Sequence, residues 1–182
     1  MPSTIRGLLT SVQFDCEQIK TVKWGHALDE TSSGIYIIST SGSIETVEGT
    51  LAYAPIDNEK LEFWINKVGT IRIDGIPSIS PFQLRARLNK FWLSDENILY
   101  IGKTDCQGGL KKRVDQYYHT ELGERSPHAG GHWIKTLSNL NNLYVHFMSC
   151  QEALSLEIEL LKSFIANVSS KALSNHGDPC NR

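Results

Sequence analysis

YIGKTDCQGGLKKRVDQYY, residues 100–118, is the most informative part of the sequence. It begins within a β-branched and aromatic run at 97–101, which is typical of a strand, continues through a glycine turn, and ends in a helix expected over 108–118. On that helix Arg113 and Tyr117 are one turn apart and lie beside the apolar stripe of Leu110 and Val114. We therefore expect both side chains to face one pocket. The alternative interpretation is a solvated helix face with an arginine that snorkels to water.

The same stretch holds the densest basic cluster of the chain. Between residues 103 and 113, the basic residues Lys103, Lys111, Lys112 and Arg113 stand against the single acidic Asp105, a balance suited to phosphate. The whole chain has 18 basic and 20 acidic residues, a formal net charge of −2 and a pI near 6.3. Its overall field does not attract a polyanion, so any contact with nucleic acid must be local.

Length and composition predict one globular domain spanning residues 1–182. Hydrophobic residues make up 40% of the 182 residues, enough to build a core. No apolar run is long enough to cross a bilayer, and the N-terminal residues lack a basic region followed by an apolar stretch, so we expect a cytoplasmic protein. The spacing of the cysteines excludes a disulfide scaffold and a zinc ribbon; they are Cys16, Cys106, Cys150 and Cys180.

Further strands and helices are expected on both sides of residues 100–118. Strands are predicted at 34–38, 97–101 and 143–148, and helices at 58–67, 81–92, 108–118, 130–138 and 151–165. This order predicts a small α/β or α+β domain without a second core. If the first two strands pair with the right register, Tyr36 and Tyr100 lie on a common face. Otherwise both tyrosines simply pack in the interior.

The last predicted helix carries a carboxylate in an apolar stripe. Ser149 and Glu152 form a capping-box pattern. From there the helical period gathers five apolar side chains on one face, and Glu157 falls among them; they are Ala153, Leu156, Leu160, Leu161 and Phe164. A buried carboxylate needs a partner, so Glu157 is either a ligand or catalyst, or one half of a buried ion pair.

The ordered set of these residues resembles the GIY-YIG endonuclease family. It comprises Gly34-Ile35-Tyr36, Tyr100-Ile101-Gly102, then Arg113, Tyr117 and Glu157, and it covers roughly residues 33–39 and 97–181. The run from Tyr100 to Tyr117 is especially similar to the N-terminal incision domain of the bacterial nucleotide-excision-repair nuclease. The resemblance implies a three-stranded antiparallel sheet flanked by helices.

It also implies a DNA endonuclease, of a restriction, defence or repair type, that uses one Mg²⁺ or Mn²⁺ ion. Glu157 would hold the metal, Tyr36 or Tyr100 would orient or deprotonate the attacking water, and Arg113 would stabilise charge on the phosphate. Lys103 and Tyr117 would assist. Candidate DNA contacts are Gly102, Lys111, Lys112, His132 and Asn181. Asn167 and Asn175 are alternatives for the family's late asparagine, and His128 is an alternative to His132.

Other classes of function remain open at this point. A non-catalytic DNA-binding module on the same scaffold is the main alternative, and a structural or partner-binding domain is a third. Since one site per chain cuts one strand, cutting of both strands would need a homodimer or two sequential nicks.

Simple family members have a short hairpin between the two motif strands, whereas residues 37–99 separate the two tyrosines here. The sequence therefore predicts an insertion at 40–95, an inserted helical subdomain. Its basic residues Arg85, Arg87 and Lys90 would either spread along a DNA groove or belong to a subdomain that only braces the sheet. We expect the insertion to select the DNA substrate without supplying catalytic groups.

Overall fold

The computed structural model describes residues 3–73, 75–124 and 131–175 and shows a mixed α/β fold. Its main sheet is antiparallel with the strand order β1-β6-β2-β5. Three of these strands, β2 (Gly34–Ser39), β5 (Ile98–Thr104) and β6 (Tyr144–Ser149), are the expected ones. The fourth, β1 (Lys20–Lys23), was not expected, so the main sheet has four strands rather than three.

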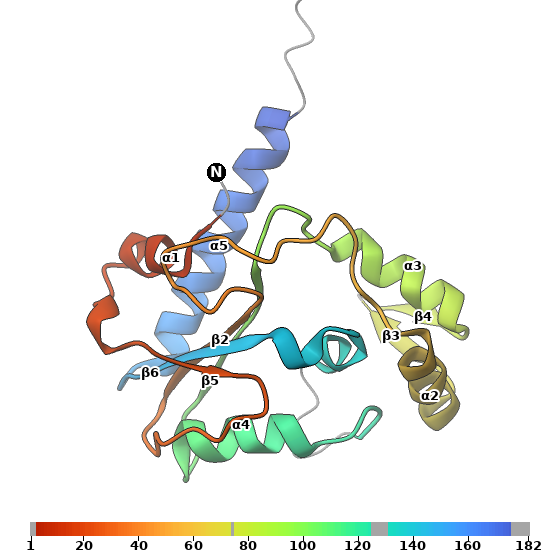
Figure 1. The fold of residues 1–182 in the computed structure, drawn as a ribbon, viewed down its shortest axis with the longest axis horizontal. Coiled ribbons are helices and arrows are strands. Elements are labelled where there is room, and N and C mark those ends of the chain that lie inside the picture. Colours follow the sequence, from red (N-terminus) through yellow and green to blue (C-terminus); the bar gives the residue numbers. More distant parts are fainter. Residues whose placement is uncertain (1–2, 74, 125–130, 176–182) are drawn as a thin grey trace, which may run out of the picture.

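Helices cover both faces of this sheet (Figure 1). Helices α1 (Ile5–Ser11) and α5 (Ala153–Asn175) lie on one face, and α4 (Gly109–His119) lies on the other. Successive side chains of β2 point to opposite faces of the sheet, so this strand contributes to two cores. Ile35 and Ile37 belong to the core under α1 and α5, whereas Tyr36 and Ile38 belong to the core under α4.

The segment between β2 and β5 first runs beside α1, where the Arg6 amide donates to the Ile44 carbonyl at 2.9 Å, and its later part forms a lobe at one end of the molecule (Figure 1). It contains α2 (Asn58–Val68), the antiparallel pair β3 (Ile71–Ile73) and β4 (Ile76–Ser78), and α3 (Pro81–Phe91), so it is not purely helical. The expected helix starts are confirmed, since Asp57 caps α2, and Ser80 caps α3 with proline at the first turn.

This lobe shares its core with the sheet. Leu61, Leu84 and Leu88 belong to the same buried cluster as Tyr36 and Ile38. The insertion is therefore continuous with the α4 side of the domain rather than a separate subdomain.

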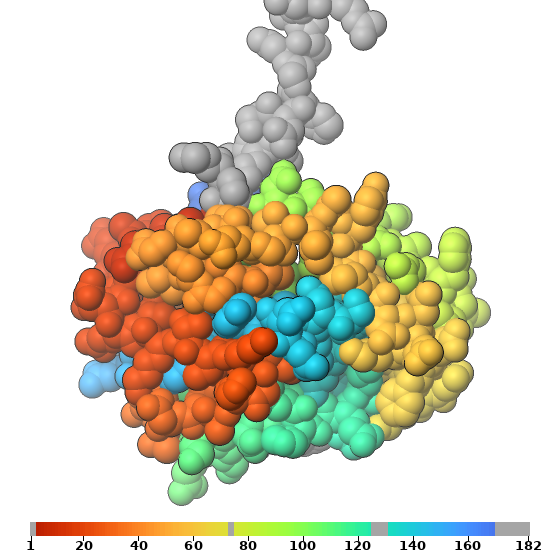
Figure 2. Space-filling view, in the orientation of Figure 1, coloured from red at the N-terminus to blue at the C-terminus, as the bar shows by residue number. Residues whose placement is uncertain are grey.

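Backbone contacts bind the lobe to the short 3-10 helix η2 (His132–Thr136) and to Ser138, which lies between η2 and a second 3-10 helix, η3 (Leu140–Asn142). The Asp57 amide donates to the Thr136 carbonyl at 2.8 Å, and the Ser138 amide donates to the Pro55 carbonyl at 2.7 Å. The 132–142 segment, in cyan, lies at the surface between the red and orange N-terminal third and the yellow insertion (Figure 2).

Several predicted boundaries were wrong, and the largest error is the end of α5, which is Asn175 rather than residue 165. The helix expected at 130–138 is only the short η2, within the residues described there. Strand β5 continues through Gly102 to Thr104, so the turn begins later than expected. Helix α5 begins at Ala153, because Ser149 is held in β6 opposite Gly34 and is unavailable as a cap.

The apolar stripe of α5 also differs from the expectation. Ala153, Leu156 and Leu160 are buried as predicted, but Leu161 is 38% exposed. It belongs to a second, outward-facing row at helical spacing that includes Leu154, Ile158 and Ile165. None of the helices in the described part of the chain has the length and hydropathy that a membrane span requires.

Candidate active site at the β5 edge

The two motif tyrosines meet on the face of the sheet that α4 covers. Tyr36 pairs with Gly102 and Tyr100 pairs with Ile38, so the tyrosines are diagonal neighbours rather than directly opposite. Their ring centroids are 5.9 Å apart. β5 is an edge strand, and Tyr100 therefore lies at the border of the sheet.

The motif glycines make these close approaches possible. A Cβ atom on Gly102 would lie 2.6 Å from Tyr100 Cε1 and 2.7 Å from Tyr36 Cζ. One on Gly34 would lie 2.2 Å from the Met148 carbonyl oxygen. Packing thus explains Gly102 fully, and its expected contact with substrate is not needed to account for it.

Tyr36 lies at the centre of a hydrogen-bonded chain. Its side chain is 1% exposed and interacts with both Tyr100 and Arg113. Burial raises the pKa of Tyr36 far above its ordinary value, the neighbouring Tyr100 raises it further, and the charge and hydrogen bond of Arg113 oppose the shift. Tyr36 is accordingly a neutral phenol at physiological pH.

Tyr100 is the more accessible of the two phenols. Its side chain is half-buried, and burial is also the main reason that its pKa is raised. The hydrogen bond with Tyr36 and the charge of Arg113 lower this pKa, whereas Glu157 raises it. Tyr100 is therefore the phenol that an incoming ligand can reach.

Tyr117 has a different environment from the one expected for an assisting catalytic group. It is fully buried, and its hydroxyl donates to the Gly131 carbonyl at 2.6 Å. Its ring centroid lies 5.8 Å from that of Tyr100, and burial raises the pKa of Tyr117 well above its usual value. We assign Tyr117 to positioning Tyr100 and Gly131.

The Lys135 ammonium lies beside Tyr117 and the end of α4. It is buried, lies 5.6 Å from the Tyr117 ring centroid, and donates to the carbonyls of Tyr118 and Thr120 at the end of α4. Burial lowers the pKa of Lys135 to about 8. Sequence reasoning missed this residue, since only the tertiary structure brings it under α4.

Glu157 reaches the same edge from the opposite face of the sheet, on α5. It is half-buried, and burial is the main reason that its pKa is raised, while Lys103 and Arg113 lower it. Asp105 raises it and thus acts as a second nearby carboxylate. Asp105 also forms an ion pair with Lys103. The role of Asp105 was not foreseen, although it follows the motif strand directly.

Two carboxylates, Glu157 and Asp105, lie near each other at this edge. In the ranges 3–73, 75–124 and 131–175, no three His, Cys, Asp or Glu side chains gather into a ready-made metal cage. Mg²⁺ commonly takes one or two carboxylates and keeps several waters, and Glu157 with Asp105 can supply such a set.

The remaining candidates are dispersed. Lys111 and Lys112 are exposed on α4. His132 is only 6% exposed, in η2, with its ring 6.0 Å from that of Trp64. Asn167 is exposed on α5. Asn181 and His128 lie outside the described residues, and so does the side chain of Asn175.

Comparison with known proteins found no matching family model, no matching curated protein and no matching solved structure.

Proposed function

We propose that this protein is a metal-dependent DNA endonuclease of the GIY-YIG type that hydrolyses phosphodiester bonds. The observation that carries the proposal is a convergence at one sheet edge. Tyr36 from β2, Tyr100 from β5, Arg113 from α4 and Glu157 from α5 interact there, although long stretches of chain separate them. Each is a residue that the sequence motif singled out.

Tyr100, Tyr36 and Arg113 would have different roles in the reaction. Tyr100, which is partly exposed, would hold and orient the attacking water through its hydroxyl. Tyr36, which is buried, would fix Tyr100. The Arg113 guanidinium would stabilise the negative charge that develops on the phosphate, as a preorganised cation does in a partly desolvated site.

Glu157, with Asp105 beside it, would hold Mg²⁺ or Mn²⁺. Such an ion, when bound, acts as a Lewis acid on the phosphate and lowers the pKa of water. The raised pKa of Glu157 fits this role, because a carboxylate whose charge is disfavoured by burial gains from a nearby cation.

Contacts with the DNA backbone would be local. Lys111 and Lys112 lie exposed on α4, the helix that also carries Arg113. They would bind phosphates flanking the scissile one. The lobe of residues 40–95 would select the substrate, and double-strand cutting would use a homodimer or two sequential nicks.

Incubation of the full chain with supercoiled plasmid and with duplex, branched and single-stranded oligonucleotides tests the proposal. We expect cleavage with Mg²⁺ or Mn²⁺ and none with EDTA. Tight binding to these DNAs without cleavage under any metal condition would instead identify a non-catalytic DNA-binding module.

A further inference from the structure

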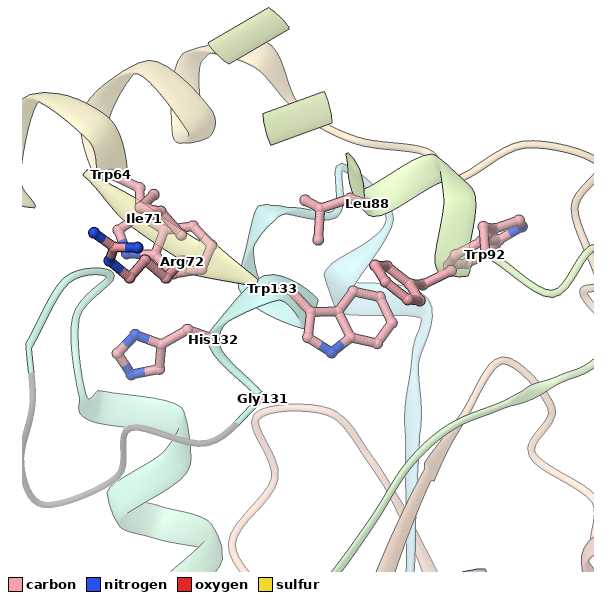
Figure 3. A pocket seen from close by; sticks show the side chains of 9 residues that line it. Trp64, Ile71, Arg72, Leu88, Trp92, Gly131, His132 and Trp133 are labelled. Carbon is pink, nitrogen blue, oxygen red and sulfur yellow. The ribbon is translucent and has the colours of Figure 1, made fainter. Parts of the chain in front are cut away.

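A cavity of about 310 Å³ lies between the inserted lobe and η2 (Figure 3). Most of the residues that line it are aromatic. None of these described lining residues has a catalytic role in the proposed reaction. The cavity's aromatic lining residues are Trp64, Phe91, Trp92, His132 and Trp133.

Aromatic pairs stand at two ends of this cavity. Trp92 and Trp133 form an edge-to-face pair with ring centroids 6.4 Å apart, and Trp64 lies 6.0 Å from His132 (Figure 3). Phe91 adds a further ring; this residue is 50% exposed, and the Arg87 guanidinium lies over its ring, 5.2 Å from the centroid. Because these rings are edge-to-face or tilted, a planar ligand would stack on the face of one ring and meet the edge of its neighbour. A nucleobase can do this, since every base offers a π-face for stacking.

Charge and size point to the same ligand. Arg72 is the single residue of formal charge in the described lining, and it is a cation at the exposed rim, where it suits a phosphate. The volume is at the lower end of the usual range for small-molecule sites, which suits one base rather than a peptide or a duplex segment.

The cavity is continuous with the candidate active site. Gly131 lines the cavity, accepts the hydrogen bond of Tyr117, and lies so close to Tyr100 that a Cβ atom on it would be 3.0 Å from the Tyr100 ring. A base in the cavity and a phosphate at Tyr100 would thus be near neighbours along one strand.

We propose that this cavity binds one unpaired base of the DNA substrate, which is stacked among the tryptophans and Phe91. The inference rests on the proposed nuclease function and narrows its substrate class to DNA with an unpaired base close to the scissile phosphate. Taking a base out of the stack costs least where it is already unpaired.

Metal-free binding tests this without any cleavage. In EDTA, the full chain is titrated into a duplex with one unpaired 2-aminopurine, the same duplex with 2-aminopurine paired, and a duplex with an unpaired abasic site. We expect tightest binding to the first duplex, with quenched 2-aminopurine fluorescence. Phe91→Ala should weaken that binding about tenfold, which corresponds to about 1.4 kcal/mol.

Phe82→Ala is the matched control, since Phe82 lies on the same helix, is 81% exposed and does not line the cavity. It should keep the preference for the unpaired base. Arg72→Gln should weaken binding and reduce its salt dependence. The proposal is wrong if wild-type protein binds the abasic duplex equally well, or if Phe82→Ala loses as much affinity as Phe91→Ala. It is also wrong if adenosine monophosphate or single-stranded RNA competes as well as the unpaired DNA base.

The two proposals fail separately. Base preference that persists in a chain that never cleaves DNA would refute the nuclease and leave the cavity as a base-binding site. Cleavage without base preference would refute the cavity proposal alone.

Discussion

The position of Arg113 in the fold brings its charge close to three other residues of the candidate site. It comes from α4, yet its charge acts on Tyr36 and Tyr100 in two strands and on Glu157 in α5. A cation close to all these groups can stabilise the negative charge that develops on a bound phosphate. Lys111, two residues earlier and exposed, has no comparable surroundings.

Arg113→Ala is therefore expected to slow single-turnover cleavage about 10²- to 10³-fold, which corresponds to roughly 2.7–4 kcal/mol, with a smaller change in DNA affinity. Lys111→Ala should mainly weaken binding. The measurement is cleavage at saturating enzyme beside a binding titration. If more enzyme fully restored the Arg113→Ala rate, the guanidinium would have no role in the chemistry.

His146 predicts a pH dependence of folding. It is fully buried, with Nδ1 2.8 Å from the Thr21 hydroxyl and Nε2 3.0 Å from the Ser41 carbonyl. Burial lowers the pKa of His146 from 6.5 to about 4. Between these values the unfolded chain binds a proton that the folded chain does not. The free energy of unfolding should thus fall as the pH drops through this window, by up to about 1.4 kcal/mol per pH unit.

Urea unfolding at pH 7, 6 and 5 measures this slope. His146→Gln should flatten it, whereas substitution of the exposed His26 by Gln should leave it unchanged. An unaltered slope in His146→Gln would show that other groups cause the acid sensitivity.

At the scale of elements, the basic residues of α3 differ in their contacts. The sequence left two roles open for Arg85, Arg87 and Lys90, either contact with DNA or membership of a subdomain that braces the sheet. In the structure, Arg85 Nη1 donates to the Ile56 carbonyl at 3.1 Å and to Asn58 Oδ1 at 2.6 Å. Arg87 lies over the Phe91 ring, and Lys90 is exposed. Arg85 thus joins α3 to the start of α2.

We predict that Arg85→Met lowers the free energy of unfolding by about 1–3 kcal/mol and leaves the salt dependence of DNA binding unchanged. Lys90→Met should leave stability unchanged and reduce the salt slope by up to about one unit. Thermal unfolding and salt-dependent binding of both variants check this. A smaller salt slope for Arg85→Met at unchanged stability would return Arg85 to the DNA-binding surface.

Elements with both a periodic pattern and a side-chain cap could be predicted from sequence, as α2 and α3 show. The α1 helix has these signals too, with Ile5, Leu8 and Leu9 after the capping Thr4, so it was predictable although it was not foreseen. Strand β1 has one apolar residue, Val22, and gives no such signal. The diagonal register of the tyrosines, and the places of Asp105 and Lys135, depend on tertiary contacts that no local pattern encodes.

At the scale of the whole molecule, the continuous core makes the inserted lobe part of the domain. Replacing residues 40–95 with a short turn would uncover Tyr36 and Ile38, which pack in the same cluster as Leu61 and Leu84. We expect the shortened chain to lose cooperative thermal unfolding and to expose apolar surface. A shortened chain with a sharp transition would show that the lobe is dispensable for folding.

Glu157 offers the most direct test of the central claim, that the β5 edge is a metal-dependent nuclease site. Single-turnover cleavage with Mg²⁺ is measured for wild type, Glu157→Gln and Glu159→Gln, beside DNA binding and thermal unfolding. We predict that Glu157→Gln abolishes cleavage but retains binding and a stability at least equal to wild type, because burial already disfavours its charge. Glu159, which is exposed on the same helix, should be replaceable without effect. Cleavage that persists in Glu157→Gln, or an equal loss in both variants, would contradict the account.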